Sequence, residues 1–284
     1  MAALRHVYAR DDYVAALGDA VAVPSWQTSV VARDFGDVRD AIGAYPMAVI
    51  GGDIAAGLAE LRESGLVSVA LVPDPLKTDI SACEAHFDRV TPFKTHLLID
   101  GQFAPSSHHA EFIRRGHRRC RIEQGPLRPW LSDWKALYAE LVALRHVDGM
   151  ADFSPAYFDV LASYDDIVAF AAFVGDEVAS MSLWLACDGV AYNHLAASNT
   201  LGYKNSAAYA VYDAAIAHFV DANIINLGGG PGALGAEDSG LFAFKAGFSN
   251  ARTTAHVCGA ILDADVYGRL CVGKETTFFP AYRG

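Results

Sequence analysis

The sequence Ile224-Ile225-Asn226-Leu227, followed by Gly228-Gly229-Gly230 and later by Leu241-Phe242-Ala243-Phe244-Lys245-Ala246-Gly247-Phe248, predicts a short strand, a glycine turn and a short helix. At about 100° per residue, Leu241, Phe244 and Phe248 form one apolar stripe of this helix, and Lys245 falls inside the stripe. A buried ammonium is costly unless it meets an anion or a developing negative charge, so Lys245 is a candidate electrophilic group in a cleft. The alternative is a lysine whose stem packs on the apolar residues while its ammonium reaches water.

The glycines after the strand match a nucleotide-binding pattern, but their context argues against it. Residues 230–235 fit the pattern G-x-G-x-x-G. A dinucleotide fingerprint also needs an acidic residue that ends a strand about 20 positions further on, and the sequence has none there. A P-loop needs a lysine directly after its glycines, which is also lacking. We therefore interpret the glycines as a turn that lets a ligand or another backbone segment approach closely.

The composition predicts a soluble globular protein with one large domain or two smaller ones. The chain has 284 residues, of which 52% are hydrophobic, so it can build a sizeable core. Its longest apolar stretch, residues 167–186, is interrupted by Asp176 and Glu177 before it reaches the roughly 18 residues that a membrane span needs. Arg5 and Arg10 leave no uninterrupted signal-peptide core near the N-terminus. We expect a cytoplasmic protein without a membrane partner.

The charge and the spacing of possible metal ligands exclude further classes. A net charge of −11 argues against a surface that adheres generally to nucleic acid or to anionic membranes, and we expect no DNA partner. The five cysteines are widely spaced and form no C-x-x-C pair, which predicts reduced thiols rather than disulfides or a zinc site. His108 and His109 are neighbours whose side chains point apart, so we predict no metal site.

One short segment of this acidic chain is basic. Within 15 residues the sequence carries Arg114, Arg115, His117, Arg118, Arg119, Arg121 and Arg128. Such a cluster suits the phosphate groups of a substrate or of an RNA end. The alternative is a solvated helix face that pairs with nearby acids.

Up to about residue 124, strands and helices alternate, which predicts a mixed α/β layer. The expected strands begin at Val7-Tyr8 and cover residues 48–50, 67–72 and 95–100. The expected helices cover residues 11–20, 54–64, 79–88 and 106–119.

A second region is expected after Gly125-Pro126 and Pro129. It contains helices over 131–145 and 155–161, three hairpin-connected strands over 167–174, 178–186 and 190–197, a loop over 198–205 and a long helix over 206–222. A last pair of strands is expected over 253–262 and a helix over 265–272. We therefore predict a first domain over 1–125, a second over 126–264, and a C-terminal tail over 265–284 that packs back on the first domain.

Three motifs accompany this order of elements: Tyr192-Asn193-His194-Leu195-Ala196-Ala197-Ser198, Leu227-Gly228-Gly229-Gly230 and Phe244-Lys245-Ala246-Gly247-Phe248. Together they resemble the acetyltransferase-like domain of the Fem family, a branch of the GNAT acyltransferase superfamily. Upstream, Thr95-His96-Leu97-Leu98-Ile99-Asp100 and Ile113-Arg114-Arg115-Gly116-His117-Arg118-Arg119 are similar to the strand and basic helix that end the family's first domain. Fem enzymes are aminoacyltransferases that build peptidoglycan cross-bridges and related peptides.

The resemblance implies an α/β protein with two GNAT-like domains, the first of them degenerate, whose mixed central sheets are splayed and flanked by helices. It implies transfer of an acyl or aminoacyl group to an amine. The acceptor is left open between a cell-wall precursor, a peptide and a sugar amine. Fem enzymes take the aminoacyl group from charged tRNA, whereas other GNAT enzymes take an acyl group from acyl-coenzyme A.

The donor-binding loop departs from the coenzyme A pattern. That pattern is Gln or Arg, x, x, Gly, x, Gly or Ala, and its backbone amides hold the pyrophosphate at the start of a helix. Here only Gly202 agrees, because Asn199 and Lys204 stand at the other two positions. We therefore predict aminoacyl-tRNA as co-substrate, acyl-coenzyme A as the alternative, and no permanently bound cofactor. The expected donor-binding residues are Gly202, Lys204, Asn205, Ser206, Gly228, Gly229 and Gly230.

Aminolysis of an ester passes through an oxyanion, and Lys245 is the expected donor to it. His194 is a candidate base, although a lone histidine on a strand is often structural. The expected substrate or phosphate contacts are Arg114, Arg115, Arg118, Arg119, Tyr203 and Tyr209. Asp238 and Ser239 are expected to cap the helix of Lys245. The competing hypothesis is a GNAT-like protein that binds a ligand without catalysis.

Overall fold

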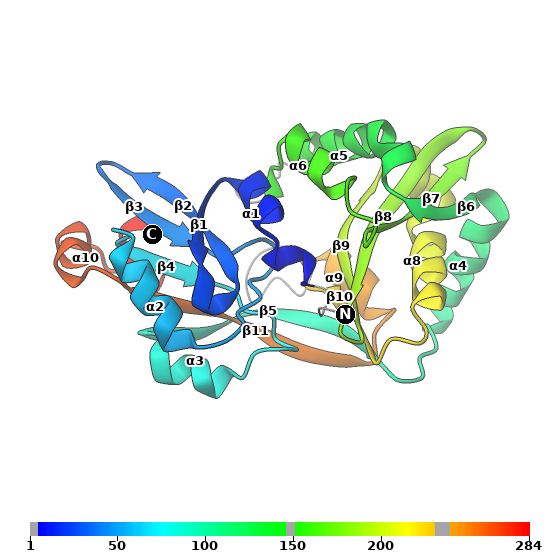
Figure 1. Ribbon diagram of the computed structural model, residues 1–284. Helices are drawn as coiled ribbons and strands as arrows, with labels where there is room; N and C mark the ends of the chain where they lie inside the picture. The colour runs from blue at the N-terminus through cyan, green and yellow to red at the C-terminus, as the bar shows by residue number, and fades with distance from the viewer. Residues whose placement is uncertain (1–4, 146–150, 231–238) are drawn as a thin grey trace. The chain divides into compact units, whose positions relative to one another are not determined.

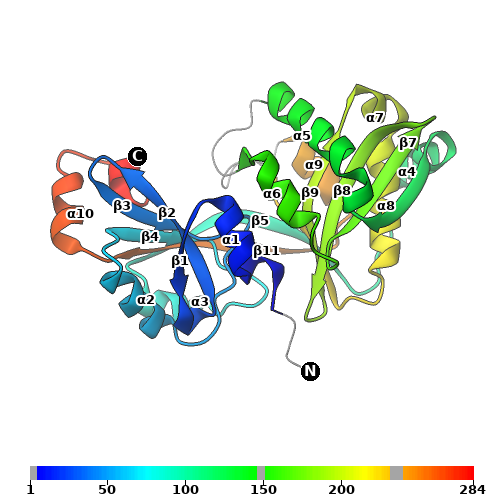
Figure 2. The same cartoon turned by 45° about the horizontal axis from the view of Figure 1, so that its top comes forward.

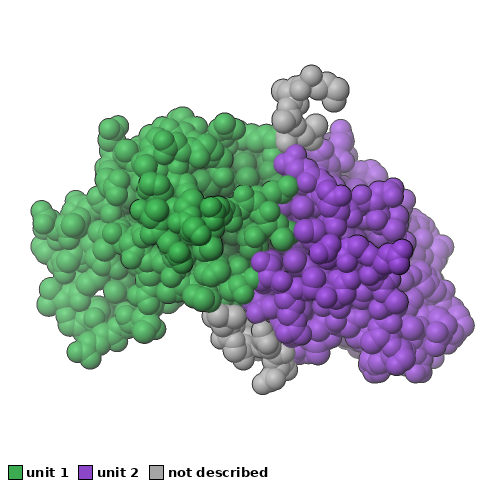
Figure 3. All heavy atoms as spheres, turned by 90° about the horizontal axis from the view of Figure 1, so that it is seen from below, with its two compact units in different colours: residues 1–94, 254–284 green, residues 95–253 purple. Residues whose placement is uncertain are grey.

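The computed structural model describes residues 5–145, 151–230 and 239–284, whose helices and strands are labelled in Figures 1 and 2. The chain divides into two compact units, which are coloured separately in Figure 3. Unit 1 contains residues 1–94 and 254–284, and unit 2 contains residues 95–253. Strands β5 (Arg89–Asp100) and β11 (Ala251–Ile261) carry the chain from one unit to the other. The mixed α/β architecture that the sequence predicts is confirmed.

Unit 1 is built on strands in the order β1-β2-β3-β4-β11, of which only β3 and β4 pair in parallel. The strands are β1 (Asp19–Val23), β2 (Thr28–Phe35), β3 (Val38–Ile42) and β4 (Ser68–Leu71), with β11. The helices are α1 (Asp11–Leu17), α2 (Ile54–Glu63), α3 (Ile80–His86) and α10 (Ala264–Leu270). Trp26, Leu58 and Leu61 lie in its apolar core.

The C-terminal residues of the chain pack on unit 1. Asp40 of β3 is 1% exposed and pairs with both Arg33 and Arg283. The Tyr282 hydroxyl donates to Asp40 over 3.0 Å and lies 2.8 Å from the Ser68 hydroxyl. A buried carboxylate is tolerated when it is paired in this way, so the network ties the C-terminal residues to the sheet.

Unit 2 has strands in the order β5-β10-β9-β8-β7-β6. Only β9 and β10 pair in parallel. The remaining bounds are β6 (Arg121–Pro126), β7 (Val168–Val174), β8 (Glu177–Cys187), β9 (Val190–Ser198) and β10 (Ile224–Gly228). The three hairpin-connected strands expected from the sequence are thereby confirmed.

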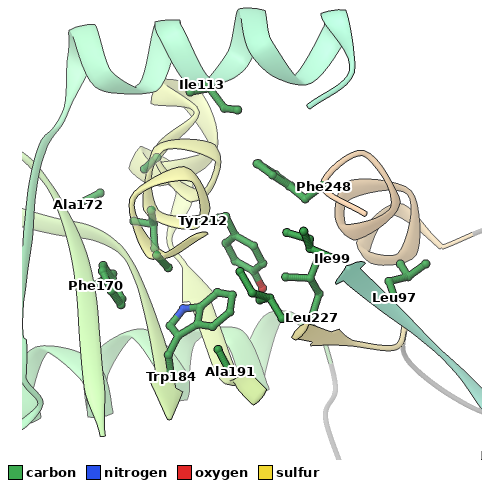
Figure 4. Packing of buried hydrophobic residues seen from close by; sticks show 14 of the residues in the cluster. Leu97, Ile99, Ile113, Phe170, Ala172, Trp184, Ala191, Tyr212, Leu227 and Phe248 are labelled. Atoms are coloured by element: carbon green, nitrogen blue, oxygen red, sulfur yellow. The ribbon is translucent and has the colours of Figure 1, made fainter. Parts of the chain in front are cut away.

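Helices cover both faces of the unit 2 sheet. Those on one face are α5 (Leu131–Arg145) and α6 (Pro155–Leu161), and those on the other are α4 (Ser107–Arg119) and α8 (Ala207–His218), as Figure 2 shows. Two shorter helices are α7 (Thr200–Asn205) and α9 (Gly240–Ala246). The core under α8 is aromatic: the Tyr212 ring lies 5.6 Å from Trp184 and 5.7 Å from Phe248 (Figure 4).

The structure corrects several sequence-based expectations. Residues 7–9 form a 3-10 helix rather than a strand, because the His6 side chain accepts from the Tyr8 N–H and starts a helical turn. Residues 48–50 make a single bridge, at Ala48, instead of a strand. The helix expected over 11–20 ends at Leu17, and three strands that were not predicted follow over 19–42. The strand pair expected over 253–262 is one continuous strand, β11.

The compact units divide the chain at other points than Gly125-Pro126. The segment over residues 95–125 lies in unit 2, because β5 pairs with β10 and α4 packs on α8. Residues 254–264 lie in unit 1, where β11 pairs with β4. The expected boundary, between residues 125 and 126, thus falls inside β6, one residue before the strand ends.

Candidate active site

Lys245 lies at the glycine turn that follows β10. Its side chain is in α9 and is only 9% exposed, and its Nζ donates to the Gly229 carbonyl oxygen over 3.2 Å. Ser239 caps the helix by accepting from the Phe242 N–H, as expected, whereas Asp238 lies outside the described residues. An ammonium in so buried a place is stabilised by polar partners and can serve a developing negative charge.

The apolar stripe of α9 differs from the expected one. Leu241 is 45% exposed, whereas Phe242 and Phe248 are buried. The Phe244 ring packs 4.8 Å from Tyr212 of α8, so the helix meets the core through a neighbouring set of positions. The inward orientation of Lys245 holds in spite of this shift.

Strands β9 and β10 part next to this turn. Their parallel pairing ends with Asn226 opposite Tyr192. Continued in the same register, Gly228 would lie opposite His194, but no pairing is formed there. The pairing of β9 with β8 also has a β-bulge at His194, because Leu183 pairs with Leu195 and Trp184 pairs with Asn193. The two strands therefore separate where the glycine turn begins. His194 lies on the β9 side of this separation, and Gly228, near Lys245, lies on the β10 side.

His194 is held by a tyrosine of the helix that covers its face of the sheet. Its side chain is 5% exposed, and its Nε2 lies 2.8 Å from the hydroxyl of Tyr157, which is fully buried. The pair joins α6 to β9. If His194 is the base, it would take the proton through the Tyr157 hydroxyl, because that hydroxyl lies within hydrogen-bond distance of Nε2.

The expected donor loop is largely helical. Residues 200–205 form α7, and Asn199 caps it by accepting from the Gly202 N–H over 2.9 Å. The Asn199 amide also donates to the Val178 carbonyl oxygen over 3.1 Å. The Gly202 and Tyr203 N–H groups are thus used inside the protein, the latter by the Asn199 carbonyl oxygen. A loop whose amides are bound internally is a poor pyrophosphate site.

Ser206 separates α7, which lies in the expected loop, from α8, and the helix expected over 206–222 is shortened to Ala207–His218. The Ser206 backbone takes a left-handed conformation with φ of 60°, which interrupts the run of helical residues. The Ser206 hydroxyl accepts from Arg115 Nε over 2.7 Å. The predicted donor residue Asn205 donates its side-chain amide to the Leu201 carbonyl oxygen.

A basic face joins α4 to α7, and we define it as Arg114, Arg115, Arg118, Arg119 and Lys204. Arg119 donates to the Lys204 carbonyl oxygen over 3.3 Å, and the Arg115 guanidinium lies 4.1 Å from the Phe112 ring centre. Arg114, Arg118, Arg119 and Lys204 are exposed. The structure therefore brings together residues that are about 90 positions apart in the sequence.

The two predicted substrate tyrosines differ. Tyr203 is 52% exposed next to Lys204. Tyr209 stacks on Phe112 at 4.9 Å and meets Phe244 edge-on at 4.9 Å, so it lies between the basic helix and the helix of Lys245. Burial raises the pKa of Tyr209. Tyr209 is therefore part of the packing between these helices rather than of an open surface.

Sequence reasoning missed three buried polar residues around Lys245. Asn226 is 1% exposed, and its Oδ1 accepts from the Gly228 N–H over 2.8 Å. His96 of β5 is 6% exposed, and its Nδ1 lies 3.3 Å from the Asn226 amide nitrogen. His109 of α4 has its Nε2 2.8 Å from the Phe244 carbonyl oxygen in α9. Asn226 interrupts the apolar run Ile224-Ile225-Asn226-Leu227, which was the available signal for it, whereas His96 and His109 have polar neighbours in the sequence.

Burial lowers the pKa of His109, and the nearby His108 adds to this effect, while the Phe244 carbonyl opposes it. His109 is therefore favoured as the neutral imidazole, with Nε2–H donating to that carbonyl. Over the parts of the chain that the structure describes, no three or more His, Cys, Asp or Glu side chains gather as metal ligands would. Within those same parts, every helix is too short or too polar to cross a membrane.

No protein-family model matches the sequence, and no curated protein matches it. Solved structures do share this architecture. FemX superposes with a TM-score of 0.61 over 85% of this chain and 86% of its own, at 11% identity. The chain has the fold of FemX. The same fold occurs in L-PGS from Bacillus licheniformis, with a TM-score of 0.64 over 89% of this chain and 88% of L-PGS, at 11% identity.

A third similar structure is the C-terminal domain of a protein assigned as a lysylphosphatidylglycerol synthetase from Agrobacterium fabrum. Its TM-score is 0.60 over 90% of this chain and 89% of that domain, at 14% identity. At such identities the likeness establishes the fold alone. The Fem-like fold expected from the sequence motifs is confirmed by these superpositions.

Proposed function

We propose that this protein is an acyltransferase that moves an aminoacyl group from aminoacyl-tRNA to the amine of a peptide or cell-wall-type acceptor. The observation that carries the proposal is the buried Lys245 ammonium, held at the glycine turn where β9 and β10 part, in a fold shared with FemX. Burying an ammonium is costly, and a developing negative charge on a substrate would offset that cost.

In the proposed reaction the acceptor nitrogen forms a bond to the ester carbonyl carbon. The bond from that carbon to the terminal ribose oxygen of the tRNA breaks, and the proton lost by the amine ends on the ribose hydroxyl. Negative charge builds up on the carbonyl oxygen in between. The Lys245 ammonium already has one hydrogen bond to Gly229, and it can donate another to that oxygen.

The donor assignment rests on the segment between β9 and α8. The amides of Gly202 and Tyr203 are bonded to Asn199, which disfavours coenzyme A pyrophosphate at this position. The basic face instead offers five cations on α4 and α7, in a chain whose net charge is −11. Such a face suits the successive phosphates of a single-stranded acceptor end.

The reaction also needs a group that takes the proton of the acceptor amine. His194 stays a predicted base, and the Tyr157 hydroxyl would relay the proton to its Nε2. Because both side chains are buried, the pair also has the structural effect of fixing α6 on β9.

The proposal is tested with bulk tRNA charged with a mixture of ¹⁴C-labelled amino acids. Filter retention compares charged with deacylated tRNA, and transfer is measured as base-stable label after addition of a small-molecule amine fraction from a cell extract. We expect tighter retention of the charged tRNA, and label that becomes base-stable only with the unsubstituted Lys245. Calorimetric binding of acetyl-coenzyme A tighter than about 100 μM, with no tRNA retention, would overturn the donor assignment. Binding of charged tRNA without transfer would favour a non-catalytic protein.

A further inference from the structure

A buried asparagine, Asn226, lies where β10 stops pairing with β9 and where its pairing with β5 shifts register. Asn226 is the last residue of β10 that pairs with β9, opposite Tyr192. On the other side it pairs with Leu98 of β5, and the register shifts directly after it, so that Gly228 is opposite Leu97. The bulged residue is Leu227, which belongs to the core. Bulges of this kind redirect a strand and re-aim the residues that follow.

Both ends of the Asn226 amide are used. Its Oδ1 accepts from the Gly228 N–H over 2.8 Å, and its Nδ2 lies 3.3 Å from His96 Nδ1. Because Oδ1 takes an N–H, the NH₂ group must face the histidine, and His96 Nδ1 must accept from it. The side chain is 1% exposed, and a primary amide is stable in such a place only when it is bonded in this way.

The turn that Asn226 holds is the one that meets Lys245. Gly228 has φ of 73°, a left-handed conformation that glycine adopts readily and other residues rarely do. The next carbonyl, that of Gly229, accepts from Lys245 Nζ over 3.2 Å. A Cβ on Gly228 would lie 3.4 Å from the same Nζ. The position of the ammonium therefore depends on the conformation of these two glycines.

We infer that Asn226 is a positioning residue for Lys245. It fixes the Gly228-Gly229 turn through Oδ1, His96 fixes the orientation of its amide, and the Gly229 carbonyl then fixes the ammonium. The inference deepens the proposed function by adding two residues to the same site. Its geometric part, the link from Asn226 to the ammonium, does not depend on which reaction the protein performs.

The test measures the reactivity of Lys245 itself. The 284-residue chain is labelled with trace acetic anhydride from pH 7 to 11, and the acetylated fraction of Lys245 is measured by mass spectrometry. The variant is Asn226→Ala, which removes both bonds. The control is Asn193→Ala, because the Asn193 Oδ1 accepts from the Tyr212 hydroxyl over 2.8 Å elsewhere in the same unit.

We expect Asn226→Ala to raise the labelling rate of Lys245 at least threefold and to shift its pH profile, and we expect Asn193→Ala to leave both unchanged. Should Asn226→Ala fail to fold, His96→Leu replaces it, with His96→Gln restoring an acceptor for the amide. A wild-type labelling rate and pH profile in the folded Asn226→Ala or His96→Leu variant would overturn the inference. If labelling changes as expected while no variant of the protein, including the wild type, transfers an aminoacyl group, the positioning role stands and the proposed function fails.

Discussion

Unit 2 carries positive charge in two different settings. Lys245 is a buried ammonium that donates to the Gly229 carbonyl oxygen of a glycine turn. The basic face carries five cations, four of them exposed. Tyr209 lies between the two settings, since its ring meets Phe112 of α4 and Phe244 of α9.

The difference shows how burial decides what a cation can do. In a buried site the attraction between charges is strong and little affected by salt, so one ammonium can change the energy of a transition state. On an exposed surface each charge contributes little, and several act together through a field that salt screens. We therefore expect Lys245 to act on the rate of the chemical step and the basic face to act on donor binding.

The largest effect is expected for Lys245→Met, which keeps the unbranched stem and removes the charge. The variant should lower kcat of aminoacyl transfer by about 10² to 10³ while retention of charged tRNA changes little, because the lost interaction is made in the transition state. Its thermal unfolding should stay close to that of the wild type, since a buried charge is removed.

Lys135→Met is the matched control for this variant. Lys135 is another lysine of unit 2, and it pairs with Asp159 over 2.6 Å. Its substitution should leave kcat unchanged. Full turnover in a folded Lys245→Met protein would show that Lys245 has no part in the chemical step, and that its buried setting does not distinguish its role from that of the basic face.

A smaller effect, with a different signature, is expected for the double variant Arg115→Ala/Arg119→Ala. For a single-stranded end, each lost phosphate contact lowers the slope of log K against log salt by about 0.7, so two should lower it by about 1.4. Filter retention of charged tRNA between 50 and 300 mM salt measures this slope. Arg121→Ala is the control, because Arg121 already pairs with Glu123. An unchanged slope in the double variant would show that the donor lies elsewhere.

The substitution Asn199→Ala tests whether α7, which carries Lys204 of the basic face, contributes to donor binding. Loss of an N-cap costs about 1 kcal/mol of unfolding free energy, which urea denaturation can measure. We also expect weaker tRNA retention, because Asn199 holds the helix that carries Lys204. Ser154→Ala removes the cap of α6 and should cost a similar free energy without affecting retention. Equal retention of charged tRNA by Asn199→Ala and Ser154→Ala would show that α7 does not contribute to donor binding.

The smallest effect is expected at His109, which joins α4 to α9 through the Phe244 carbonyl. Burial lowers its pKa in the folded protein, so below about pH 6.5 the unfolded chain binds more protons than the folded one. The unfolding free energy should therefore fall as the pH drops from 7 to 5, and less steeply in His109→Gln. Thermal unfolding across this pH range measures the difference, and identical profiles would contradict it.

Local signals in the sequence were sufficient for much of the fold of unit 2. The hairpin strands were predictable from their turns, and α4 and α6 from Ser106 and Ser154 at their starts. The strands over 19–42 were not predictable, because the five residues Thr28 to Ala32 of β2 are all buried and show no alternation. The helix expected from residue 206 begins at Ala207, whereas α7 was expected as a loop, because it is only six residues long and contains Gly202, which weakens a helical pattern.

The candidate site was predictable only in part. The burial of Lys245 followed from its place in a helical pattern, although the phase of that pattern shifted from Leu241 to Phe242 when α9 docked on the core. The partners of the lysine depend on pairing between β5 and β10, whose residues His96 and Asn226 are 130 positions apart. The register of two distant strands is a property of the folded sheet, and neither segment shows it alone.

The crossing of α4 over α8 suggests how distant relatives of this protein could be recognised. A Cβ on Gly116 would lie 2.6 Å from the Ser206 carbonyl oxygen and 2.9 Å from the Ala210 Cβ, so the two helices touch through their backbones. Arginines on the surface of α4 can exchange places during evolution, because only their summed charge matters to a polyanion. A glycine at this crossing and a small residue facing it cannot. That pair is therefore a better search signature for chains with the same arrangement than the arginines themselves.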